Sequence, residues 1–122
     1  MIGYVTVGTN DFARAAKFYD ALLAELGAKR TMEFGSSFVV WGRGDGPALA
    51  LTKPYDKKPA TVGNGVMVAL AARSKEQVHK IYDKAIALGA TDEGKPGPRG
   101  DTFYAGYFRD PDGNKLNCFF MG

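Results

Sequence analysis

The chain has 122 residues, of which 45% are hydrophobic and 24% charged, a size and balance typical of one globular domain. Its formal net charge of +3 is spread along the chain without a basic run, which argues against nucleic-acid binding. A single cysteine, Cys118, cannot form an internal disulfide, and no hydrophobic run approaches the ~20 residues of a membrane span. Because the N-terminus also lacks the pattern of a secretory signal, we expect a soluble, cytoplasmic protein with no membrane partner.

The first half of the chain predicts one strand, one helix and three further strands. Residues 4–7 alternate as in a strand, and Asn10 and Asp11 then offer an N-cap. A helix ending at Gly27 is indicated by hydrophobic residues at three- and four-residue spacing, namely Phe12, Ala15, Ala16, Tyr19, Leu22, Leu23 and Leu26. Glycine-rich breaks then separate short strands expected at residues 29–33, 38–42 and 48–52.

The second half repeats this order after a polar connector. Residues 66–71 predict a strand, and Ser74 with Gln77 forms a capping box for a helix that ends at Gly89. Residues 91–93 suggest a short strand and residues 94–101 a loop, before strands at 103–109 and 115–120. The segment DPDGN, residues 110–114, predicts a tight turn between the last two strands. Both helices end in the letters LGA, so the chain reads as a tandem duplication.

Alternation along the strands predicts two different sheet faces. The face expected under the helices is hydrophobic throughout: Val5, Val7, Leu49, Leu51, Val66, Val68, Leu70, Leu116, Cys118 and Phe120. The opposite face is mixed, with Tyr4, Thr6, Ala50, Thr52, Met67, Ala69, Asn117 and Phe119. Mixed lining is typical of a ligand cleft, although a second core layer or a wet sheet surface would show the same pattern.

The opening YVTVGTNDFARAAKFYDALLAELGA and the closing YFRDPDGNKLN resemble the vicinal oxygen chelate superfamily of glyoxalase I, bleomycin-resistance proteins and extradiol dioxygenases. The resemblance covers essentially the whole chain, and the DPDGN turn is its most specific mark. It implies an α+β fold in which two tandem βαβββ units form a half-barrel sheet around a cleft, with the helices on the outer face. On this interpretation residues 1–122 are a single glyoxalase-like domain, with one unit at about 1–53, a connector at 54–64 and a second unit at about 65–122. The resemblance also implies a homodimer.

In metal-dependent members of that superfamily, four strands supply ligands that are typically His or Glu. Carried over to this chain, those positions fall on Tyr4, Ala50, Met67 and Asn117. Ala50 has no donor atom, Met67 is a soft thioether, and Asn117 is a neutral, weak donor. The sequence therefore predicts no metal and no cofactor, which argues against glyoxalase I or ring-cleaving dioxygenase chemistry. The single histidine, His79, is expected on the surface of the second helix.

Two functions remain open from the sequence, beside a purely structural role with a filled cleft. The first is metal-free binding of a small organic molecule, as in bleomycin-resistance proteins. Its candidate ligand-binding residues are Tyr4, Thr6, Trp41, Thr52, Met67, Arg99, Tyr104, Tyr107, Asn117 and Phe119. The alternative is a lyase- or isomerase-type enzyme in which Tyr4 donates a proton and Asn117 holds a carbonyl or oxyanion. Arg99 and Lys95 could then meet an anionic substrate, whereas ordinary core packing is the alternative for each aromatic residue.

Overall fold

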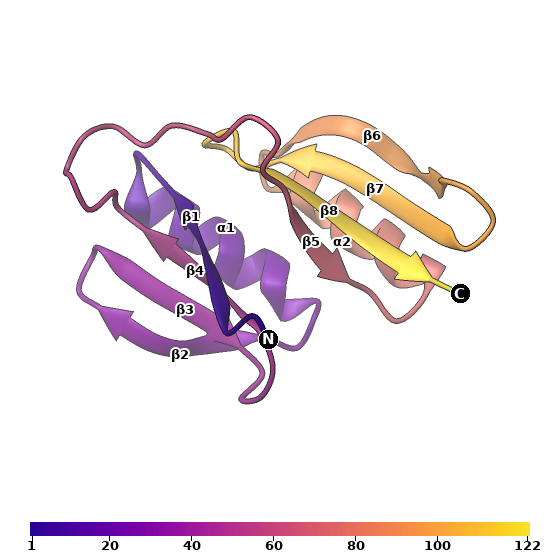
Figure 1. The fold of residues 1–122 in the computed structure, drawn as a ribbon, viewed down its shortest axis with the longest axis horizontal. Coiled ribbons are helices and arrows are strands. Elements are labelled where there is room, and N and C mark those ends of the chain that lie inside the picture. Colours follow the sequence, from indigo (N-terminus) through magenta and orange to yellow (C-terminus); the bar gives the residue numbers. More distant parts are fainter. The chain divides into compact units, whose positions relative to one another are not determined.

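A computed structural model describes residues 1–122 and shows an α+β chain in which the order strand, helix, three strands occurs twice (Figure 1). The elements are β1 (Tyr4–Gly8), α1 (Phe12–Ala24), β2 (Lys29–Phe34), β3 (Phe38–Gly42), β4 (Ala48–Thr52), β5 (Val68–Ala71), α2 (Lys75–Ala87), β6 (Thr91–Pro98), β7 (Phe103–Arg109) and β8 (Lys115–Met121). The fold of two tandem βαβββ units predicted from the sequence is confirmed. No helix is both long enough and hydrophobic enough to cross a membrane.

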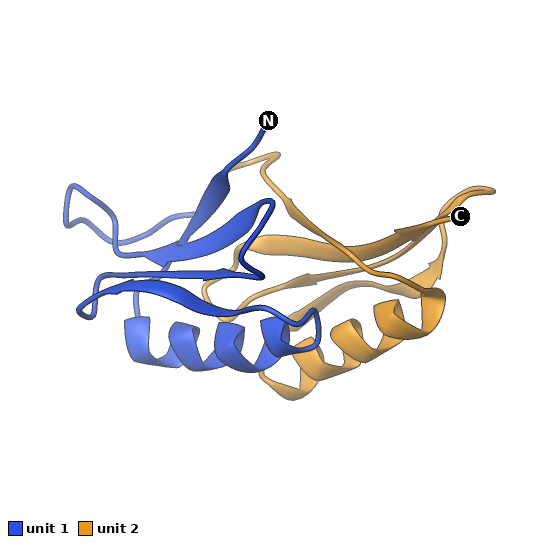
Figure 2. Cartoon of the chain, turned by 90° about the horizontal axis from the view of Figure 1, so that it is seen from below, with its two compact units in different colours: residues 1–62 blue, residues 63–122 orange.

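The chain divides into two compact units, unit 1 at Met1–Val62 and unit 2 at Gly63–Gly122 (Figure 2). Each unit has a four-stranded sheet, in the order β1-β4-β3-β2 or β5-β8-β7-β6. The first and last strands of each unit pair in parallel, and the remaining neighbours pair antiparallel. In each unit the helix packs against one face of its own sheet and leaves the other face, here called the open face, without a helix (Figure 2).

The connector expected at 54–64 belongs mainly to unit 1. Asn10, in the turn before α1, holds it with two hydrogen bonds. Its Nδ2 donates to the Ala60 carbonyl at 3.1 Å, and its Oδ1 accepts from the Ala60 N–H at 2.6 Å. Asp11, rather than Asn10, is the N-cap of α1, because its Oδ1 accepts from the Arg14 N–H.

The core of each unit lies between helix and sheet, as the alternation predicted. In unit 1 the fully buried hydrophobic side chains include Leu22 of α1, Val39 of β3 and Leu51 of β4. In unit 2 they include Ile81 of α2, Phe108 of β7 and Leu116 of β8. This burial supplies the main stabilisation of each helix on its sheet.

Two boundaries differ from the sequence prediction. β5 begins at Val68 rather than residue 66, so Met67 precedes the strand, and Val66, expected under the helix, is 64% exposed. β6 extends to Pro98 through much of the predicted loop 94–101. Its glycines and prolines looked like loop residues, but β6 is an edge strand, where missing N–H groups are tolerated. Register shifts beside Gly94 and Gly97 accommodate the irregular backbone.

Candidate functional site

The open face of unit 2 carries several predicted site residues, and contacts on the other face identify it. The Cys118 thiol lies 3.4 Å from the Val78 carbonyl of α2, and a Cβ at Gly106 would lie 3.2 Å from the Tyr82 ring. Even-numbered residues of β7 and β8 therefore face the helix. Their odd-numbered neighbours face the open side, because side chains alternate along a strand.

Asn117 is a buried polar residue of this open face and is only 1% exposed. It lies on β8 opposite Ala69 of β5 and Tyr107 of β7. Its side-chain oxygen Oδ1 is buried and has no hydrogen-bond partner. A buried acceptor without a donor is rare and costs roughly 1–3 kcal/mol, so this atom marks a place where a donor is missing.

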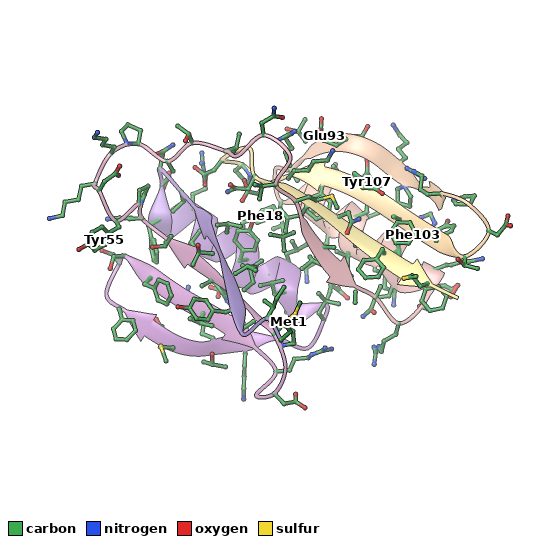
Figure 3. All side chains as sticks on the ribbon, in the orientation of Figure 1. Met1, Phe18, Tyr55, Glu93, Phe103 and Tyr107 are labelled. Atoms are coloured by element: carbon green, nitrogen blue, oxygen red, sulfur yellow. The ribbon has the colours of Figure 1, made fainter.

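Tyr107, labelled in Figure 3, lies opposite Asn117 in the register of β7 and β8 and contacts two cations. The Arg99 guanidinium lies 5.5 Å and the Lys115 ammonium 5.7 Å from the centroid of the Tyr107 ring. Both distances are typical of cation–π contacts. Three hydrogen bonds hold the Arg99 side chain against β6, because its Nη1 donates to the Gly97 and Pro98 carbonyls and its Nη2 donates to the Lys95 carbonyl.

The same face continues into an aromatic pair. Phe119 of β8 and Phe103 of β7 stack with ring centroids 5.4 Å apart and an interplanar angle of 18°. Both rings are half-buried. The open face of unit 2 thus has a polar part around Asn117 and a hydrophobic part around Phe119.

The open face of unit 1 is largely hydrophobic. Tyr4 is 59% exposed, and its ring meets the ring of Phe38 edge-on at 6.4 Å. Phe38 also contacts Phe34, at 6.0 Å. Thr6 is exposed on this face, and the Thr52 hydroxyl donates to the carbonyl of Lys53. No group accepts a hydrogen bond from the Tyr4 hydroxyl, so no neighbouring base supports it as a proton donor.

The strand registers show that the four family ligand positions are equivalent in the two units. Thr6 lies opposite Ala50 across β1 and β4, and Ala69 lies opposite Asn117 across β5 and β8. Thr6 follows Tyr4 by two residues, as Ala69 follows Met67.

The side chains at these positions do not fit the divalent metal that the superfamily implies. Ala50 is fully buried and has no donor atom, and Met67 offers only a thioether. Nowhere do three His, Cys, Asp or Glu side chains come together in a group that could hold a metal ion.

Two of the predicted ligand-binding residues lie on the helix side of their sheets rather than on the open face. Trp41 is 1% exposed and packs against α1, where its Nε1 donates to Asp20 at 2.8 Å. Tyr104 lies on the α2 side of its sheet, and its hydroxyl is 2.6 Å from His79 Nε2. Trp41 and Tyr104 are therefore corrected to helix-side packing residues, which their aromatic character alone could not reveal. His79 is exposed on α2, as expected.

Three residues of the open faces were missed in the sequence. Lys115 and Phe103 share the open face with Asn117, and Phe38 shares the other open face with Tyr4. For Lys115 the signal was available, because it has the same strand parity as Asn117 and Phe119, which were already assigned to that face. Phe103 and Phe38 lie on strands to which the sequence assigned no face. The remaining candidates, Met67 among them, keep their ligand-binding role as a prediction.

Comparisons with known proteins agree with this architecture. The family model of the glyoxalase/bleomycin resistance protein/dioxygenase superfamily matches residues 1–118. A solved glyoxalase/bleomycin resistance protein from Albidiferax ferrireducens T118 is 39% identical, with a TM-score of 0.92 over 100% of this chain and 99% of that chain. A lactoylglutathione lyase from Agrobacterium tumefaciens is 22% identical, with a TM-score of 0.71 over 98% and 92% of the chains, a likeness that concerns the fold alone. No curated protein matches this chain.

Proposed function

Because this chain belongs to the glyoxalase/bleomycin resistance protein/dioxygenase superfamily, we propose that it binds a small organic molecule directly through protein side chains on its open sheet faces, without a divalent metal. The observation that carries this proposal is the buried side-chain oxygen of Asn117, which has no donor within the protein. An O–H or N–H group of a ligand would satisfy it and recover the cost of burying an unpaired acceptor.

The surroundings of Asn117 suit an organic ligand. Half-buried aromatic rings at Tyr107 and Phe119 lie on the same open face, and flat aromatic surfaces give a small molecule hydrophobic contact. A few polar groups among hydrophobic ones are the usual composition of a ligand site, since the polar groups fix orientation.

The side chains at the family's metal-ligand positions support ligand binding without a metal. The superfamily's metal-dependent chemistry needs several hard or borderline ligand atoms on one ion. Ala50 and Met67 supply no such atom. Ligand affinity must then come from contacts with side chains. The 39% identity to a glyoxalase/bleomycin resistance protein is compatible with this mode.

The test is a thermal-shift screen of small organic molecules on chelator-treated protein whose metal content has been measured. We expect at least one compound to raise the melting temperature in a concentration-dependent way, because a ligand that binds only the folded state stabilises it. Added Mn²⁺, Ni²⁺, Zn²⁺ or Fe²⁺ should leave its affinity unchanged. Mass spectrometry of the recovered compound distinguishes binding from turnover.

Two exposed tyrosines provide a matched pair of variants. Tyr4→Ala alters the open face of unit 1, whereas Tyr55→Ala alters the connector, where the side chain is fully exposed. Only Tyr4→Ala should weaken a ligand that uses the open face of unit 1. A stoichiometric metal that the hit compound needs for binding would overturn the proposal, and turnover lost in Tyr4→Phe would support the enzymatic alternative.

A further inference from the structure

We infer that the open face of unit 2 selects a small organic anion that carries a hydroxyl donor next to the anionic group and a hydrophobic group beyond it. This inference rests on the proposed function and specifies the chemical class of its ligand. Four residues carry it, here called the anion cluster: Arg99, Tyr107, Lys115 and Asn117.

The two cations of the anion cluster have no counter-charge. Neither Arg99 nor Lys115 has a carboxylate within ion-pair distance, although both contact the same Tyr107 ring. Arg109, on the same sheet, shows the contrast, because its Nε donates to Glu93 at 2.9 Å. Two uncompensated positive charges on one open face give that face a positive potential, which attracts an anion.

Arg99 is also preorganised for this role. Its hydrogen bonds to the carbonyls of Lys95 and Gly97, at 2.8 and 2.9 Å, hold the side chain in place without neutralising its charge. A cation that is already fixed loses less conformational entropy when it binds an anion than a free surface side chain does.

Asn117 adds the second requirement. It lies directly opposite Tyr107 in the register of β7 and β8, and Lys115 precedes it by two residues on the same face of β8. Its unpaired Oδ1 accepts only from a donor. An ammonium donor would be repelled by Arg99 and Lys115, so a neutral hydroxyl next to the anionic group fits best.

The stacked rings of Phe103 and Phe119 supply the third requirement. Phe119 follows Asn117 by two residues on the same face, and its ring is half-buried. A planar hydrophobic group of the ligand would cover this surface while its polar end meets the anion cluster.

Three matched probes separate these requirements in isothermal titration calorimetry. 3-Phenyllactate has all three groups, 3-phenylpropionate lacks the hydroxyl, and 3-phenyllactamide lacks the charge. We expect 3-phenyllactate to bind most tightly, with each of the other two about tenfold weaker, since one hydrogen bond or charge-assisted contact is worth about a factor of ten.

Variants assign each requirement to its residue. Arg99→Gln and Lys115→Gln should weaken both acids about tenfold and leave the amide unchanged. Asn117→Leu should abolish the preference for 3-phenyllactate over 3-phenylpropionate, and Asn117→Ala provides the same comparison if the leucine variant does not fold. Lys17→Gln, on the exposed side of α1, removes one charge from unit 1 and should change nothing.

The outcomes separate this inference from the proposed function. Absence of 3-phenyllactate binding at about 10 mM, or binding that Arg99→Gln and Lys115→Gln leave intact, overturns the anionic ligand class. A neutral compound from the thermal-shift screen that binds in that case leaves the proposed function standing. If no compound of any class binds, the proposed function itself is wrong.

Discussion

At the residue scale, Asp110 explains why the DPDGN turn is so specific a feature of the sequence. The side chain is buried, and its Oδ1 accepts hydrogen bonds from the backbone N–H groups of Asp112 and Asn114, at 3.0 and 2.9 Å. Its Oδ2 accepts from the Asn114 side chain at 2.9 Å. A single carboxylate thus organises the turn that sets the register of β8, and with it the position of Asn117.

Replacing that carboxylate should destabilise the protein. We expect Asp110→Ala to lower the free energy of unfolding by about 2 kcal/mol, because three donors lose a charged acceptor. Urea denaturation followed by circular dichroism measures the change. Asp101→Ala, in the exposed loop before β7, is the matched control and should stay within about 0.5 kcal/mol of the wild type. Equal stability of the two variants would mean that solvent replaces the bonds to Asp110.

Cys118 gives a second prediction at this scale. Burial raises the pKa of its thiol to about 11, and the side chain is fully covered under α2. The thiolate is the reactive form, so we expect no labelling by a disulfide reagent at neutral pH until the protein is unfolded. Labelling of the native protein at the rate of a free thiol would show that unit 2 opens readily.

At the scale of elements, the helices were predictable, whereas most of the irregular strand β6 was not. The hydrophobic spacing in α1 and the capping box of α2 are local signals, and the observed N-cap bonds at Asp11 and Ser74 follow from them. Only the start of β6, at residues 91–93, was predicted, because Pro96 and Gly97 disfavour a strand locally. Pairing with β7 overrides that preference. Pairing between two segments depends on both of them and cannot be predicted from the sequence of one alone.

The candidate site shows the same division between local and long-range information. Strand parity was sufficient to place Asn117 on the open face and Cys118 under the helix. It did not reveal that the Asn117 oxygen lacks a donor, or that Arg99 and Lys115 meet at one ring, because those facts depend on side chains from different strands. For Trp41, the deciding contact is a hydrogen bond to Asp20 on a helix distant in the sequence.

At the scale of the whole molecule, each unit links its helix to its sheet through hydrogen bonds to one carboxylate, a contact here called the tie. The carboxylate lies on the helix in one unit and on the sheet in the other. In unit 1 the carboxylate is on the helix: Asp20 of α1 accepts from Arg30 of β2, at 2.8 Å, and from Trp41 of β3. In unit 2 it is on the sheet: Asp92 of β6 accepts from the Tyr82 hydroxyl of α2, at 2.6 Å. The two units therefore share a fold, but different residues form the hydrogen bonds of the tie between helix and sheet in each unit.

These two ties predict how stability depends on pH. The hydrogen bond from Arg30 holds the pKa of Asp20 below its usual 3.8, and the hydrogen bond from Tyr82 does the same for Asp92. Because both pKa values are lower in the folded than in the unfolded chain, the stability that they contribute is present above pH 3.8 and is lost as the pH falls through the lowered values. Urea denaturation at a series of pH values should show a decline in the free energy of unfolding below about pH 4.

Substitution of the two carboxylates separates this effect from the general repulsion among positive charges in acid. Asp20→Asn and Asp92→Asn should each be less stable than the wild type at pH 7, because a neutral amide is a weaker acceptor than a carboxylate. Each should also lose less stability on acidification, since one linked proton has been removed. Asp45→Asn, in the exposed loop before β4, makes the same change of charge and should keep the wild-type slope. If all three variants declined in parallel with the wild type, neither tie would be the origin of the acid sensitivity, and the repulsion among the basic residues would account for it.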